Sequence, residues 1–187
     1  GLQNKLIRKV EERGDALVVI DIDDDYRETH ENSGTRTGGN ISSAITSIQS
    51  RDINSSYAAT YFPRIKLKDT LSGNDEILIA PASVGAIGAM AFSEANSEGP
   101  WFAPAGFNRG GLSVLGGQSG PRVVGTWKTL SKKNRDDLYV ENINPIARFP
   151  AVGEIVIFGQ KTLQQTPSAL DRINVRRLMI FLKKRIG

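Results

Sequence analysis

Residues 17–25 have the sequence L-V-V-I-D-I-D-D-D, in which an apolar run ends in acidic side chains. A short apolar run bounded by polar residues is typical of a buried β-strand. Residues 41–52 then repeat apolar side chains at helical spacing, and residues 57–68 are expected to form two strands around Phe62–Pro63. A strand followed by a helix and further strands indicates a sheet covered by helices.

The rest of the chain extends this pattern without an internal repeat. A helix is predicted to start at Pro81, and its residues Gly85 and Gly88 favour close packing because glycine otherwise weakens a helix. Ser131 and Ser168 are candidate N-caps of two later helices. We therefore expect an α/β fold of mixed α+β character, with a central mixed β-sheet flanked by helices. The remaining predicted elements are a helix at 2–12 and strands at 123–130, 146–149 and 154–158.

Composition excludes several kinds of chemistry. The 187 residues include no cysteine and a single histidine, His30, so disulfides, thiolate metal sites and mechanisms that need two histidines are ruled out. No apolar run approaches the length of about 18 residues that a membrane-spanning helix needs. We expect neither a signal peptide nor membrane insertion.

Charge is distributed unevenly along the chain. The net charge is +4, but residues 21–31 contain six acidic side chains and one arginine, whereas residues 169–187 contain six basic side chains and one acid. Such asymmetry is found in proteins that bind nucleic acid, a membrane surface or a charged protein partner.

The acidic run is the first candidate for catalysis. Asp21 and Asp23 follow a strand, as do the nucleophile and the acid/base of haloacid-dehalogenase phosphatases, but Asp25 stands where those enzymes carry Thr or Val. Tyr26 replaces the glycine that an EF-hand loop starting at Asp21 would need. We expect Asp21, Asp23, Asp24 and Asp25 to form an exposed, non-catalytic loop, which is also a candidate acidic interface. A phosphatase-like hydrolase that uses Asp21 and Asp23 is the alternative.

Other catalytic patterns are incomplete. No G-K-S or G-K-T follows the glycine clusters, so a P-loop is absent. Ser119 misses the nucleophile-elbow pattern because Pro121 occupies its last glycine position. We expect no catalytic residue, no cofactor and no bound metal.

The last helix combines an apolar stripe with a basic one. The apolar stripe is predicted to face the core, and it consists of Val175, Leu178, Met179, Leu182 and Ile186. The basic stripe consists of Arg172, Arg176 and Lys183, with Arg177 and Lys184 beside it. A solvated face, a nucleic-acid-binding face and a surface for an acidic protein partner are the three possible roles of this stripe.

Four blocks in order resemble the contractile tail sheath family, especially the sheaths of T4-like phages. They are G-P-W-F-A-P-A-G-F-N-R-G at 99–110, R-D-D-L-Y-V-E-N-I-N-P-I at 135–146, F-G-Q-K-T-L at 158–163 and P-S-A-L-D-R-I-N-V-R-R-L at 167–178. The resemblance is specific from about residue 76 onward and weaker before it.

The resemblance implies a structural subunit and not an enzyme. Sheath proteins form stacked hexameric rings around an inner tube and contract to drive the tube through a target cell envelope. R-type bacteriocins, extracellular injection systems and type VI secretion use related sheaths. The implied partners are other copies joined by arm exchange through β-strand addition, the inner tail tube protein, and baseplate and tail terminator proteins. The implied location is a virion tail or an equivalent contractile particle, assembled in the bacterial host cytoplasm.

The resemblance also suggests which part of a sheath subunit this is. Residues 1–187 are expected to form a single tail-sheath core domain that lacks the N-terminal arm and the C-terminal strand and arm. The chain alone would then be soluble and would form no tubes. The basic residues Arg172, Arg176, Arg177, Lys183 and Lys184 are expected to face an acidic surface of the inner tube or of a neighbouring sheath subunit.

Overall fold

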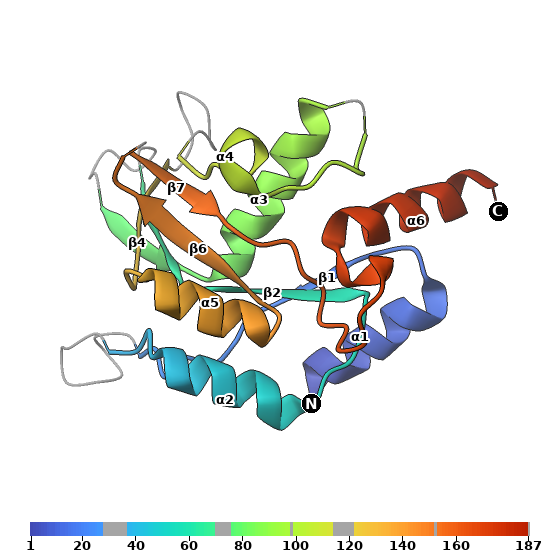
Figure 1. Ribbon diagram of the computed structural model, residues 1–187, viewed down its shortest axis with the longest axis horizontal. Helices are drawn as coiled ribbons and strands as arrows, with labels where there is room; N and C mark the ends of the chain where they lie inside the picture. The colour runs from blue at the N-terminus through green and yellow to red at the C-terminus, as the bar shows by residue number, and fades with distance from the viewer. Residues whose placement is uncertain (28–36, 70–75, 98, 114–121, 152, 187) are drawn as a thin grey trace.

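The centre of the molecule is a four-stranded mixed sheet (Figure 1). The computed structural model describes residues 1–27, 37–69, 76–97, 99–113, 122–151 and 153–186. The strand order is β1-β2-β6-β7, with β1, β2 and β6 parallel and β7 antiparallel to β6. The bounds of these strands are Val18–Ile20 for β1, Ala58–Phe62 for β2, Ile143–Phe149 for β6 and Glu154–Ile157 for β7.

A second sheet has three antiparallel strands in the order β4-β3-β5. They are β3 (Ile65–Lys68), β4 (Ile77–Ala80) and β5 (Arg122–Thr126). The expected mixed α+β architecture with a mixed sheet and covering helices is confirmed. The sequence predicted a single sheet, because strand propensity does not tell which strands pair.

Helices cover both faces of the four-stranded sheet (Figure 1). One face packs against α1 (Leu2–Arg13), α2 (Ile41–Arg51) and α5 (Lys132–Val140), and the other against α3 (Ala82–Ala95) and the second sheet. Side chains alternate along β2, so that Ala58 and Phe62 enter the first core whereas Ala59 and Tyr61 enter the second. The remaining helices are α4 (Gly106–Arg109), the 3₁₀ helix η1 (Ala169–Asp171) and α6 (Ile173–Ile186).

Two of the predicted helix starts differ in outcome. The Ser131 side chain accepts a hydrogen bond from the Asn134 backbone, as expected for the cap of α5. Ser168 instead caps η1 by accepting from the Leu170 backbone. Ser168 was therefore wrongly assigned to the last helix, because the single turn of η1 intervenes and α6 begins only at Ile173.

The close packing expected of the Pro81 helix occurs at Gly85. A Cβ atom built on Gly85 would lie 3.1 Å from Ile65 Cδ1 and 3.4 Å from Leu112 Cδ1, so the helix sits directly on the second sheet. Gly88 is only half-buried, and close packing there stays a prediction.

We predict that Gly85→Leu destabilises the protein by about 1–3 kcal/mol through overpacking. Gly88→Leu is the matched comparison on the same helix and should cost less, because Gly88 is more exposed. Urea unfolding followed by circular dichroism measures both. Equal midpoints for Gly85→Leu and the wild type would contradict the packing described above.

Candidate interface surfaces

The acidic segment after β1 is mostly engaged in structural bonds. The Asp21 carboxylate accepts hydrogen bonds from the backbone nitrogen of Ser83 at 3.1 Å and from its hydroxyl at 2.6 Å. Ser83 lies in the first turn of α3, where backbone N–H groups lack partners inside the helix. Asp21 therefore fastens the start of α3 to the end of β1, and this explains its position after a strand without catalysis.

Asp24 contradicts the expectation of an exposed acidic loop. Its side chain is only 2% exposed and pairs with the Arg64 guanidinium at 3.3 Å. The Arg64 guanidinium carbon also lies 4.4 Å from the centre of the Tyr26 ring. The ion pair with Asp24 and this cation–π contact together attach the acidic segment to Arg64. The sequence pattern missed this because Arg64 is forty residues away.

Asp23 and Asp25 are exposed, as expected. Asp23 accepts a hydrogen bond from the Asp25 backbone, and Asp25 accepts one from the Ser43 hydroxyl. The four carboxylates thus point to separate partners. Within the described ranges, no group of three or more Asp, Glu, His or Cys side chains could hold a metal ion.

Helix α6 is rotated relative to the prediction. Its buried residues are Ile173 and Arg176, whereas Met179 is 47% exposed and Ile186 is 83% exposed. The expectation that the apolar stripe faces the core and the basic stripe faces outward is therefore wrong for this helix. Three of the five residues of the apolar stripe, Met179, Leu182 and Ile186, are exposed instead.

Arg176 lies inside the protein. Its guanidinium carbon is 3.9 Å from the centre of the Tyr57 ring, and Nη2 donates to the Ser56 hydroxyl at 2.5 Å. The residue is 7% exposed, so it offers almost no charge to a partner. A planar guanidinium can stack on an aromatic ring, and this contact explains how a charged side chain is accommodated at a buried position of α6.

Arg177 is also largely enclosed. Its side chain is 11% exposed and its guanidinium pairs with Glu94 of α3 at 2.8 Å. Burial lowers the pKa of the Arg177 guanidinium, although the neighbouring carboxylate of Glu94 opposes this shift. Burial likewise raises the pKa of the nearby Tyr61 hydroxyl. Arg177 therefore fastens α6 to α3.

The remaining basic residues of the predicted stripe are accessible. Arg172 donates to the Tyr139 hydroxyl at 2.6 Å and pairs with Asp171 at 3.1 Å while keeping 42% of its side chain exposed. Lys183 donates to the Arg13 carbonyl at 2.7 Å. Lys183, Lys184 and Arg185 are all exposed and form the basic end of α6.

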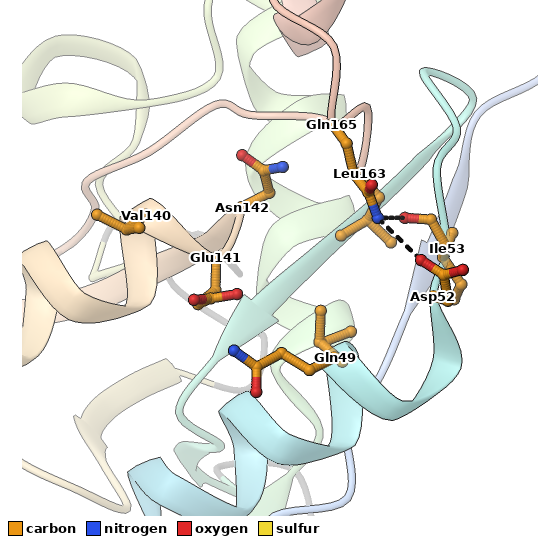
Figure 2. Close-up of a pocket in the computed structure, with 9 residues that line it drawn as sticks. Gln49, Asp52, Ile53, Val140, Glu141, Asn142, Leu163 and Gln165 are labelled. Atoms are coloured by element: carbon orange, nitrogen blue, oxygen red, sulfur yellow. Dashed lines mark hydrogen bonds between the residues drawn. The ribbon is translucent and has the colours of Figure 1, made fainter.

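A surface pocket of about 370 Å³ lies where α2 and α5 end (Figure 2). Its rim carries Asp52 and Glu141, and the Gln165 amide donates to the Asp52 carboxylate at 3.3 Å. The other lining residues have apolar or amide side chains, and they are Ile48, Gln49, Ile53, Val140, Asn142 and Leu163. No sequence pattern pointed to this pocket, because its lining comes from segments far apart in the chain.

Comparison with known proteins identifies the relatives of the chain. No family model matches it. The tail sheath protein of Vibrio phage KVP40 is 40% identical over 114 residues, which are 61% of this chain, and that of Enterobacteria phage T4 is 41% identical over 87 residues, or 46%. Over these residues the chain is similar to phage tail sheath proteins. The tail sheath protein of Salmonella phage ViI is 36% identical over 114 residues.

The similarity covers a limited part of these sheath proteins. The matched residues make up 16% of the KVP40 protein and 12% of the T4 protein. The fold agrees with that of chains in two solved particles, an anti-feeding prophage baseplate and a PVC sheath complex. A chain of the contracted anti-feeding prophage baseplate matches with a TM-score of 0.64 at 17% identity, over 98% of this chain and 41% of that one. The contracted PVC sheath matches with a TM-score of 0.59 at 24% identity, over 80% and 37%.

None of the described helices is both long and apolar enough to cross a membrane.

Proposed function

We propose that this chain forms part of the core of a contractile tail sheath subunit. The subunit polymerises as stacked hexameric rings around an inner tube and shortens to drive that tube through a target cell envelope. The observation that carries the proposal is the sequence identity to phage tail sheath proteins, which the shared fold supports.

A structural role also fits the chemistry of the described residues. The acidic run was the best candidate for hydrolysis. In the structure, however, Asp21 caps the start of α3 and Asp24 pairs with Arg64. A phosphatase nucleophile needs a carboxylate that is free to attack a phosphate. Nucleic-acid binding by the basic helix is disfavoured as well, because Arg176 and Arg177 are turned into the protein. We infer a non-enzymatic role.

The proposal implies specific partners and a location. Other copies of the chain, the inner tail tube protein, and baseplate and tail terminator proteins are the partners of a sheath subunit. The protein would lie in a virion tail or an equivalent contractile particle and would assemble in the cytoplasm of the bacterial host.

Electron microscopy of the native protein that carries this chain tests the proposal. Negative-stain images should show tubes of constant width. A preparation that stays monomeric under all assembly conditions, or that hydrolyses phosphate esters with a loss of activity in Asp21→Asn, would contradict it.

We further propose that the accessible part of the basic stripe is an assembly surface. Arg172, Lys183 and Lys184 contact an acidic surface of the inner tube or of a neighbouring copy. Arg176 and Arg177 instead hold α6 in place. The exposed carboxylates of Asp23 and Asp25 are the part of the acidic run that is accessible to a partner.

Combining Lys183→Glu with Lys184→Glu should impair assembly and leave folding intact. Single exposed ion pairs contribute only about 0–1 kcal/mol, but six copies per ring would multiply the effect over a long tail. Electron microscopy counts the tails, and thermal unfolding of the variant controls for folding. Normal extended tails from the double variant would show that these lysines are not part of an assembly surface.

A further inference from the structure

The pocket at the ends of α2 and α5, which we call the α2–α5 pocket, is lined by both apolar and acidic side chains (Figure 2). Ile48, Ile53 and Leu163 provide carbon surface. Asp52 and Glu141 place carboxylates at its edge, and none of its nine lining residues is basic. This combination distinguishes the pocket from a simple cluster of acids on a convex surface.

The backbone adds to the negative potential there. Asp52 is the C-cap of α2 and Glu141 is the C-cap of α5, so both helices end at the pocket. The C-terminus of a helix carries roughly half a negative charge, because its last carbonyls have no partners within the helix. Two helix ends and two carboxylates therefore favour a cation in the same small volume.

The shape of the pocket selects the kind of cation. A metal ion would need three or more oxygen ligands in a fixed geometry, and the described residues contain no such group. A lysine or arginine side chain fits better, since its methylene stem covers apolar surface while its charged head stays at the polar rim. The occupant is then a basic side chain of a protein partner.

The same chain carries a matching basic element at another place. Lys183, Lys184 and Arg185 form the exposed basic end of α6, which lies away from α5 in Figure 1. Two complementary patches at different places on one molecule make a heterologous contact, in which each copy offers one patch to the next. Such contacts generate rings or helical filaments.

We propose that the α2–α5 pocket receives the basic end of α6 from a second copy of this chain, with Lys184 or Arg185 seated against Glu141 and Asp52. This inference rests on the proposed function, which requires copies to assemble, and it names the two surfaces that meet.

Site-specific cross-linking tests the contact, because the chain contains no cysteine and each introduced thiol is unique. One variant carries Gln49→Cys at the pocket, and a second carries Ile186→Cys beside the basic end of α6. The two are mixed in equal amounts at low ionic strength with a short bismaleimide cross-linker. A control pair replaces Gln49→Cys by Val84→Cys, which lies on an exposed position of α3.

We expect the 49–186 heterodimer to form about tenfold faster than the control pair, a factor that two partly exposed charge pairs can supply. Adding Glu141→Lys to the pocket variant should reduce the rate to that of the control. This substitution should leave α5 folded, since a basic residue is favourable at a helix C-terminus. Pairing Glu141→Lys with a partner that carries Lys184→Glu and Arg185→Glu should restore part of the rate.

Cross-linking of the 49–186 pair at the control rate would overturn the inference, as would a fast rate that Glu141→Lys leaves unchanged. In both cases the basic end of α6 would be available to the inner tube instead. The proposed function would be unaffected if the native protein still formed tubes, so the two failures are distinguishable.

Discussion

Replacing Asn144 by alanine is expected to lower the free energy of unfolding by about 3 kcal/mol. Asn144 is fully buried in β6, at the centre of the four-stranded sheet. Its amide donates to the Thr60 carbonyl at 3.0 Å and to the Lys161 carbonyl at 2.8 Å, and its carbonyl accepts from the Lys161 backbone at 2.6 Å. Alanine would leave these backbone groups without their side-chain partner and would also open a cavity.

Thermal unfolding measures this effect. For a chain of this size, a loss of 3 kcal/mol corresponds to a fall in melting temperature of about 6–12 °C. Asn54→Ala is the matched control, because Asn54 is exposed and its side chain accepts a single hydrogen bond from Gln165. A melting temperature for Asn144→Ala within about 2 °C of the control, under 1 kcal/mol, would mean that the segment around Lys161 is not fastened to β6 in this way.

Arg176→Glu should destabilise the protein by about 3 kcal/mol or more, since it puts a carboxylate in a buried site without a basic partner. The substitution would remove the contact with the Tyr57 ring and the hydrogen bond to Ser56. The negative charge would then face the electron-rich face of an aromatic ring, which repels it.

Two variants on the same helix control for the change of charge. Lys184→Glu is exposed and should change the free energy of unfolding by less than about 0.5 kcal/mol. Met179→Asp should also be mild, because Met179 is 47% exposed. A severe loss for Met179→Asp together with a neutral Arg176→Glu would mean that α6 is oriented as its apolar periodicity predicts and not as described above.

Most of the elements could be predicted because their signals are local. Apolar spacing identified α2 from residues 41–52, and the actual helix is Ile41–Arg51. The turn chemistry of Ser131 identified the start of α5. The division of the strands into two sheets could not be predicted in this way, because pairing depends on residues far apart in sequence.

The orientation of α6 shows a second limit. Its apolar stripe is the stronger periodic signal, yet the sequence does not reveal that Tyr57 and Ser56 line the contact surface. These two residues satisfy an arginine better than an aliphatic side chain. Ile173 and Ile180 lie on the same side as Arg176, seven residues apart, and this spacing was the one available hint.

The candidate surfaces could be predicted only where their residues are neighbours in the sequence. The exposed carboxylates of Asp23 and Asp25 and the basic end of α6 follow from runs of like charge. Asp24 and the α2–α5 pocket do not, because both depend on tertiary contacts: Asp24 meets Arg64, and the pocket joins the ends of two helices to Leu163 and Gln165.

Labelling of intact particles tests the central proposal most directly. Gold-labelled antibodies raised against residues 1–187 would be imaged by electron microscopy on tails before and after contraction. The account predicts labels along the whole length of each tail, and a labelled structure that becomes shorter and wider on contraction. Labels confined to one end of the tail, or on a structure whose length never changes, would contradict the assignment of this chain to a contractile sheath.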